Sequence, residues 1–161
     1  MNRTEMVVLT VIVIAIGTLM HFVHELPFFN NTLGYFFPVN ECAWEHMKMI
    51  FYPMLLAAIY MCLSNHGIEY FGGMILASII AIPVMLALFY CYFPFTHHSV
   101  LIADIILYVG VMSAAVYFGA KWSFNPWIQK NWILFIGLAL GVSGGLSYLT
   151  YHAPDNFMFR V

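Results

Sequence analysis

Two short stretches near the start of the chain hold imidazoles and carboxylates at spacings that could bind a metal ion. The first is His-Phe-Val-His-Glu at residues 21–25, and the second is Glu-Cys-Ala-Trp-Glu-His at residues 41–46. Both stand beside long apolar runs. An ionisable side chain in a membrane helix costs about 2.5–3.5 kcal/mol, so these groups need compensating partners. Metal coordination, proton transfer and a network of salt bridges are the available explanations.

Helical spacing predicts which of these side chains share a face. Residues four apart lie on the same side of a helix, so His21 pairs with Glu25 and Glu41 pairs with Glu45. If two antiparallel helices carry the stretches, these carboxylates meet the imidazoles of His21 and His46 around one small volume. Carboxylate and imidazole donors suit zinc, iron and manganese, and we expect a divalent metal, with zinc as the first choice. The predicted metal ligands are His21, Glu25, Glu41, Glu45, His46 and His98.

Further polar residues are expected to orient these ligands. A ligating imidazole usually donates its second N–H to a carboxylate or a carbonyl, which fixes the ring. Asp104 lies about one and a half turns into the fourth apolar segment, where a lone acid is costly. The predicted supporting residues are Asn40, Asp104, His24 and His152. The alternative for His152 is a solvated residue of the tail.

A metal with an open coordination position would supply the chemistry. It lowers the pKa of a bound water to about 7 and so makes a hydroxide nucleophile. One of Glu25, Glu41 and Glu45 could act as general base, while His98 or Lys48 stabilises developing negative charge. The sequence therefore predicts a metal-dependent hydrolase acting at the outer membrane–water interface. The predicted catalytic residues are Glu45, Glu41 and Lys48.

Three other interpretations fit the same residues. A proton or divalent-cation transporter would use the acids and histidines as a relay, with Pro53 and Pro83 breaking helices beside the pathway. A small non-catalytic membrane subunit or assembly factor would dock a partner at its polar end. A structural network of salt bridges would need only Lys48 to neutralise Glu41 or Glu45. The gathering of polar residues at one end of the apolar segments disfavours transport.

Composition indicates that membrane helices position these residues. The 161 residues are 63% hydrophobic and 7% charged, whereas soluble domains carry about 25% charged residues. A spanning helix needs about 20 apolar residues. We predict an all-α, polytopic membrane protein that forms a single domain, with the lipid bilayer as partner and no nucleic-acid binding. The predicted bundle has about five transmembrane helices, at residues 5–24, 41–63, 70–92, 99–121 and 129–150.

Local patterns add three expectations. Asn40 should cap the second helix, with Glu41 in its first turn. The aromatic connection 26–39 is either a lid over the polar cluster, as a re-entrant or interfacial segment, or an aromatic belt. Glycines repeat along the fifth helix at a spacing that lets membrane helices approach closely, and this face predicts a homo-oligomer. They are Gly137, Gly141, Gly144 and Gly145.

The few basic residues predict an orientation. Arg3, Lys121 and Lys130 fall at one end of the segments, whereas Arg160 lies in the tail at the other end. By the positive-inside rule, the N-terminus is cytoplasmic and the C-terminus lies outside the cell membrane. Most of the histidines and acids then face outward.

The polar blocks resemble a family of small, uncharacterised bacterial integral membrane proteins. Its pattern reads H-F-x-x-E, then P-V-N-E-S-x-W-E-H-x-K, and the chain has these blocks at residues 21–25 and 38–48. Cys42 stands where the pattern has Ser, which argues against a role that needs a hydroxyl there. The resemblance implies a multi-helix membrane fold and no particular activity. It also implies a shared polar core of His21, Glu25, Asn40, Glu41, Glu45, His46 and Lys48.

Overall fold

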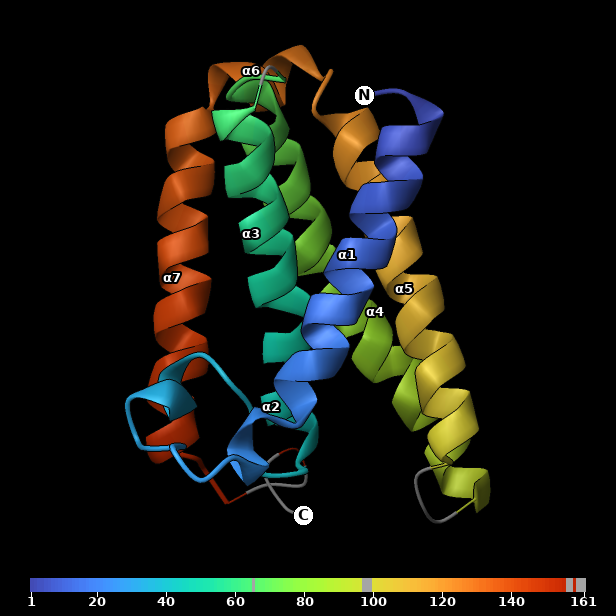
Figure 1. Cartoon of the computed structure of the whole chain (residues 1–161), viewed down its shortest axis with the longest axis vertical. Helices are drawn as coiled ribbons and strands as arrows, with labels where there is room; N and C mark the ends of the chain where they lie inside the picture. Colours follow the sequence, from blue (N-terminus) through green and yellow to red (C-terminus); the bar gives the residue numbers. More distant parts are fainter. Residues whose placement is uncertain (65, 97–99, 156–157, 159–161) are drawn as a thin grey trace.

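The structure is a computed structural model that describes residues 1–64, 66–96, 100–155 and 158. The described residues form helices joined by turns, with no β-strand among them. Two 3-10 helices, η1 (Val23–Glu25) and η2 (Leu33–Tyr35), lie between α1 and α2. Figure 1 shows the long helices side by side, with the N-terminus at one end and the connection from α1 to α2 at the other. The α-helices are α1 (Arg3–His21), α2 (Ala43–His46), α3 (Lys48–Leu63), α4 (Glu69–Thr96), α5 (Leu101–Trp122), α6 (Pro126–Lys130) and α7 (Trp132–Tyr151).

Five segments of the described chain are long and apolar enough to cross a membrane. This confirms the predicted all-α fold with about five transmembrane helices. The observed boundaries differ from the predicted ones by a few residues, and α4 runs on through Pro94 to Thr96. The five segments are Arg3–Glu25, Ala43–Leu63, Glu69–Thr96, Leu101–Trp122 and Trp132–Tyr151.

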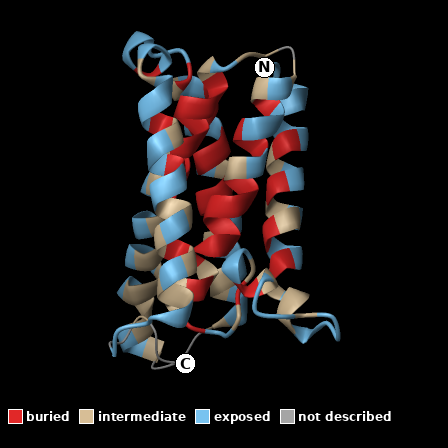
Figure 2. Ribbon diagram, turned by 90° about the vertical axis from the view of Figure 1, so that its left-hand side faces the viewer, coloured by how far each residue is buried: buried red, intermediate tan, exposed pale blue. Residues whose placement is uncertain are grey.

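The second of these segments is the centre of the bundle. In its apolar stretch of 18 residues, 61% of the residues are buried inside the protein, compared with 17–28% in the corresponding stretches of the other four segments. Figure 2 shows the resulting band of buried residues through the middle of the molecule. Lipid is as apolar as a leucine side chain, so this helix is held by close packing more than by exclusion from water. A polar side chain on the buried face of α3 is therefore enclosed by protein and must find its partners there.

Close helix contacts occur at glycines outside the fifth spanning helix. A Cβ atom added to Gly73 of α4 would lie 2.3 Å from the carbonyl oxygen of Gly119 of α5. A Cβ added to Gly17 of α1 would lie 2.6 Å from the carbonyl oxygen of Met49 of α3. By contrast, a Cβ added to any glycine of α7 meets no described atom within 4 Å. Packing within the described chain does not require the α7 glycines, and self-association through them stays a prediction.

The helix α2 begins later than the sequence predicted. Its N-cap is Cys42, and the side chain of Asn40 accepts a hydrogen bond from the Cys42 backbone N–H at 3.0 Å. The prediction that Asn40 caps the helix, with Glu41 in its first turn, is wrong. Asn side chains readily bond a backbone N–H two residues further on, and this bond forms a turn ahead of the helix. Glu41 therefore lies outside α2.

The connection 26–39 packs against the ends of α3 and α7. The carbonyl oxygens of Gly34 and Phe37 accept hydrogen bonds from Lys48 Nζ at 2.7 and 3.2 Å. Hydroxyl groups of α3 and α7 donate to the carbonyl oxygen of Tyr35. The connection thus covers the Lys48 ammonium at the start of α3.

Candidate metal centre

Two histidines and one glutamate meet at the end of the bundle where α1 stops and α2 begins. His21 is the last residue of α1, Glu41 precedes α2, and His46 is the last residue of α2. Glu41 Oε2 lies 3.7 Å from His21 Nε2 and 3.6 Å from His46 Nε2. One ligand atom from each residue lies within 4.8 Å of the other two. We call His21, Glu41 and His46 the His/Glu cluster.

A hydrogen bond assigns the two ring nitrogens of His46. Nδ1 lies 2.9 Å from the carbonyl oxygen of Cys42, so we assign the N–H to Nδ1, which donates to that oxygen. In the neutral ring, Nε2 then carries a lone pair. This lone pair is 3.6 Å from the carboxylate of Glu41, so two electron-rich atoms are neighbours. A cation between them, either a proton or a metal ion, makes the contact favourable.

The geometry of the cluster fits a tetrahedral metal site with one open position. Ligand bonds of about 2.0–2.2 Å place tetrahedral donors about 3.4 Å apart. The two separations from Glu41 to the imidazoles, 3.6 and 3.7 Å, are slightly longer, and all three donors lie within 4.8 Å of one another. Two imidazoles and one Glu form a donor set of catalytic zinc sites, in which water takes the fourth position. The side chains of His21, Glu41 and His46 are 29%, 50% and 39% exposed, so water can reach them. These donors also suit other divalent transition metals, so they do not select zinc.

The neighbouring carboxylate of Glu45 is bound to a different partner. Its Oε2 lies 2.8 Å from Lys48 Nζ, and the two side chains are 2% and 0% exposed. Glu45 also accepts hydrogen bonds from the Val39 N–H at 3.0 Å and the Thr150 hydroxyl at 2.9 Å. Lys48 donates its remaining protons to two carbonyls of the connection 26–39. Such full satisfaction is what lets a protein tolerate a buried ion pair. The pair therefore has the form of a structural salt bridge.

Glu25 and His24, two other predicted site residues near the end of α1, lie in different positions relative to the His/Glu cluster. Because α1 ends at His21, Glu25 falls in η1 and does not share an α-helical face with His21. The Glu25 side chain is exposed and forms no ion pair with another described residue. His24 stays next to the cluster, with its Nδ1 2.9 Å from the carbonyl oxygen of His21 and the two ring centroids 6.4 Å apart. The predicted ligand His98 lies outside the described residues.

Asp104 and His152 lie at the same end of the bundle on other helices. Asp104 is in the first turn of α5 and accepts a hydrogen bond from the hydroxyl of Tyr92 in α4. His152 follows α7, where its exposed ring stacks on Tyr148 with centroids 4.4 Å apart. Each of these predicted supporting residues therefore has a local partner, and neither belongs to the His/Glu cluster.

Cys42 is adjacent to the cluster in the sequence but does not add a ligand to it. The residue is 2% exposed, and burial raises the pKa of its thiol. Its sulfur is not among the donor atoms that lie within 4.8 Å of one another.

Sequence reasoning missed a group of hydroxyls between α3 and α7. The Tyr52 hydroxyl lies 3.3 Å from both Ser143 Oγ and Ser147 Oγ, and Thr150 binds Glu45 about one turn further along α7. Positions 143, 147 and 150 follow the i, i+4, i+7 spacing of one helix face. That spacing is readable in the sequence, and it identifies the face of α7 that packs on α3.

The five apolar helices fit a multi-pass membrane protein, and the cluster at one end gives this protein a candidate metal centre. The chain matches a family described as a family of unknown function (DUF6512) over residues 2–156, and it belongs to that family. This confirms the predicted membership of an uncharacterised family. No curated protein and no solved structure matches the chain.

Proposed function

We propose that this protein binds a divalent transition-metal ion at the His/Glu cluster, next to one membrane–water interface. The supporting observation is the approach of three donor atoms to within 4.8 Å, with the His46 ring oriented by a backbone carbonyl. A cation among electron-rich donors this close makes their approach favourable. A proton is the competing cation, because a protonated imidazole also pairs with a carboxylate.

The proposed activity is metal-dependent hydrolysis. A metal held by three protein ligands with a fourth position open can activate water. Glu41 would be a ligand, and Glu45 is bound to Lys48, which leaves Glu25 as the general base near the end of α1. The substrate would be a group that reaches the interface, such as a lipid headgroup, a lipid-linked carrier or a membrane-proximal peptide.

Transport of protons or divalent cations is the second candidate function. The hydroxyls of Tyr52, Ser143 and Ser147 favour it, because they continue the polar groups of the cluster end into the spanning helices. Beyond them, most buried side chains of the described core are apolar, such as Met54, Met74 and Met112, and Ser78 is a buried hydroxyl among them. A relay through one copy of the chain would have to cross this apolar core, and hydrolysis requires no such path.

The proposed orientation places the metal centre outside the cell. Arg3, Lys121 and Lys130 lie at the end of the bundle that holds the N-terminus, opposite the connection from α1 to α2 (Figure 1). By the positive-inside rule, this basic end faces the cytoplasm of a cell membrane. Labelling of a cysteine introduced at Glu25 in intact cells tests the orientation. Labelling only after permeabilisation would reverse it.

Metal analysis of the full chain tests the proposed binding. The protein is purified in mild detergent without chelators, and bound metal is counted by mass spectrometry for wild type, His21→Ala and Glu41→Gln. We expect about one metal ion per wild-type chain and a loss of most of it in both variants. His152→Ala is the matched control, because it removes an exposed histidine at the same end. Wild-type protein without stoichiometric metal would overturn the proposal and favour the proton.

A paired assay separates hydrolysis from transport. Liposomes report flux of protons or divalent cations, and detergent samples report turnover of lipid and peptide esters or amides. Hydrolysis predicts turnover that Glu25→Gln abolishes while bound metal is retained. Flux without turnover would make transport the better function for the same metal centre.

A further inference from the structure

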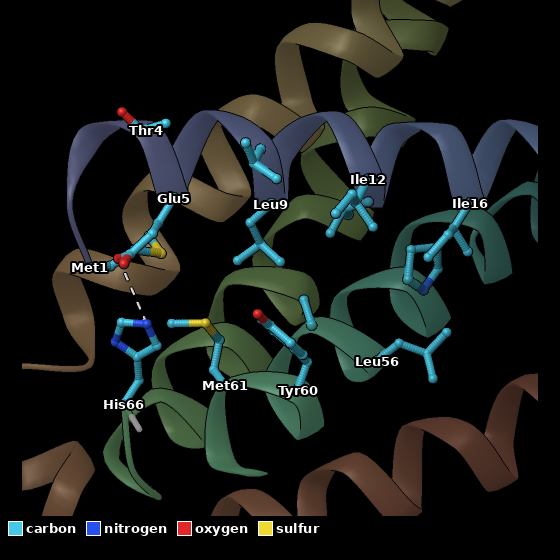
Figure 3. Close-up of a pocket in the computed structure, with 14 residues that line it drawn as sticks. Met1, Thr4, Glu5, Leu9, Ile12, Ile16, Leu56, Tyr60, Met61 and His66 are labelled. Atoms are coloured by element: carbon cyan, nitrogen blue, oxygen red, sulfur yellow. Dashed lines mark ion pairs between the residues drawn. The ribbon is translucent and has the colours of Figure 1, made fainter. Parts of the chain in front are cut away.

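A second feature lies at the opposite end of α1 from the metal centre. A cavity of about 400 Å³ lies between α1 and α3 and is lined on α1 from Thr4 to Ile16 (Figure 3). Ligand pockets in proteins span about 300–1,000 Å³, so this cavity has room for a small molecule or a single lipid chain. Both helices belong to predicted membrane spans, so the medium beside the cavity is hydrocarbon.

The lining of this cavity changes from polar to apolar along its length. At the mouth, Glu5 Oε2 and His66 Nε2 are 3.7 Å apart. Met61 and Leu9 follow, and then the hydroxyl of Tyr60, which points toward α1 (Figure 3) and forms no hydrogen bond with another described residue. Beyond Tyr60 the labelled walls are aliphatic, with Ile12, Ile16 and Leu56. Charge, hydroxyl and hydrocarbon follow one another in the order of the headgroup, ester and acyl chain of a glycerophospholipid.

The length of the cavity agrees with this order. Thr4 and Ile16 are the first and last residues of α1 that line it, and a helix rise of about 1.5 Å per residue makes that distance about 18 Å. One leaflet contributes about half of a hydrocarbon core of about 30 Å. A chain that starts at the mouth would therefore reach close to the middle of the bilayer.

The charges at the mouth indicate which headgroup fits. Glu5 Oε2 accepts a hydrogen bond from the Asn2 N–H at 2.8 Å and also faces His66, while Glu5 Oε1 has no hydrogen-bond donor among the described residues. The N-terminal ammonium of Met1 lines the same mouth, and it donates to the Tyr70 hydroxyl at 3.2 Å. A carboxylate oxygen in this position suits a primary ammonium, which can donate charge-assisted hydrogen bonds. The neighbouring imidazole, once protonated, suits a phosphate. The mouth thus matches a zwitterion with an ammonium and a phosphate.

We propose that the cavity between α1 and α3 binds one phosphatidylethanolamine molecule. One acyl chain lies between the helices, the Tyr60 hydroxyl donates to an ester carbonyl, and the ammonium binds Glu5. Lipid is the proposed occupant because the cavity opens on hydrocarbon, where an unfilled space loses the packing contacts of its walls. This site is separate from the metal centre and does not depend on it.

Native mass spectrometry of the full chain in detergent tests the proposal. Phosphatidylethanolamine, phosphatidylcholine and phosphatidylglycerol are added at equal concentration, and retained lipid is counted. We expect one retained phosphatidylethanolamine, preferred over the other two by about tenfold, because only its headgroup combines an N–H donor with a phosphate. Equal retention of all three lipids would overturn the proposal.

Adjacent valines of α1 provide a matched pair of variants. Val8 lines the cavity and Val7 does not, although the two are 51% and 60% exposed. Val8→Trp should lower retained lipid about tenfold by filling the cavity, whereas Val7→Trp should leave it unchanged. Equal effects would contradict the site, and so would a Val8→Trp change in oligomeric state, which would assign the cavity to a second copy.

Removal of one hydroxyl keeps the test independent of folding. Tyr60→Phe should lower phosphatidylethanolamine retention several-fold without changing the melting temperature, because one hydrogen bond to lipid is lost. Tyr117→Phe removes a comparable hydroxyl from the exposed side of α5 and should have no effect. Unchanged retention in Tyr60→Phe would remove Tyr60 from the site and overturn the proposed position of the ester.

Discussion

Two groups of ionisable side chains lie within a few residues of each other and differ in almost every physical property. The Glu45–Lys48 pair is closed: its charged atoms are 2.8 Å apart, almost without exposure, and each has further hydrogen-bond partners. The His/Glu cluster is open: its donors are 3.6–3.7 Å apart and 29–50% exposed. A closed, satisfied pair holds a structure together, whereas an open set of converging donors can accept an ion.

The difference follows from where each group lies relative to α3. Lys48 is the first residue of the central helix, so protein surrounds its ammonium, and the connection 26–39 supplies the carbonyls that it needs. Glu41 precedes α2 and His21 ends α1, so both lie at the rim of the bundle. Composition alone does not distinguish these environments, because both groups combine carboxylates with nitrogen bases.

The largest expected effect is on stability, from breaking the closed pair. Lys48→Ala should lower the free energy of unfolding by about 3–5 kcal/mol, because it leaves the Glu45 carboxylate buried without its counter-ion. Unfolding of the purified protein in detergent measures this loss. Lys130→Ala, at an exposed lysine, is the control. A Lys48→Ala protein with wild-type stability would show that the closed pair is not structural.

The next largest effect is expected on metal affinity, when one of the three proposed ligands of the His/Glu cluster is removed. His46→Ala should weaken metal binding at least about 100-fold, more than loss of a supporting residue costs, while costing the metal-free protein only about 1 kcal/mol from the lost hydrogen bond to Cys42. Competition with a coloured chelator measures the affinity. In wild type the affinity should fall on acidification, because protons compete with the metal for imidazole nitrogens. Affinity independent of pH and of His46 would place the metal elsewhere.

A smaller effect should come from one neutral partner of the closed pair. Thr150→Val keeps the shape of the side chain and removes a hydrogen bond to Glu45, so it should cost about 1 kcal/mol of unfolding free energy. Thr10→Val removes a hydroxyl that bonds only to the Met6 carbonyl oxygen within α1, away from the closed pair, and it is the isosteric control. Metal affinity should be unchanged in both. If Thr150→Val weakened metal binding as much as His46→Ala, the two groups would be one site.

The smallest effect on either property is expected at the open glycine face of α7. Gly141→Leu should change neither stability nor metal affinity, because its Cβ meets no described atom within 4 Å. If the predicted homo-oligomer forms through this face, the added side chain should lower the self-association measured by cross-linking in membranes. Loss of metal together with loss of self-association would mean that a second copy completes the cluster.

Part of the candidate site could be predicted from residue types, and part could not. His21, Glu41 and His46 stand out as ionisable residues beside apolar runs, and the structure brings these three together. The grouping of Glu41 with Glu45 relied on one continuous helix through both positions. The turn at Asn40 and Cys42 delays the start of α2, so the two carboxylates do not share a face.

The sequence by itself determined that the protein is a helical bundle fit for a membrane, because runs of about 20 apolar residues satisfy their backbone hydrogen bonds in hydrocarbon only as helices. It also determined that the ionisable residues gather near helix ends. Only the tertiary structure decided which carboxylate belongs to which group. Burial beside α3 commits Glu45 to Lys48, whereas the rim leaves Glu41 beside two imidazoles. Local spacing cannot supply this result, because the carbonyls that satisfy Lys48 come from residues 11 and 14 positions away.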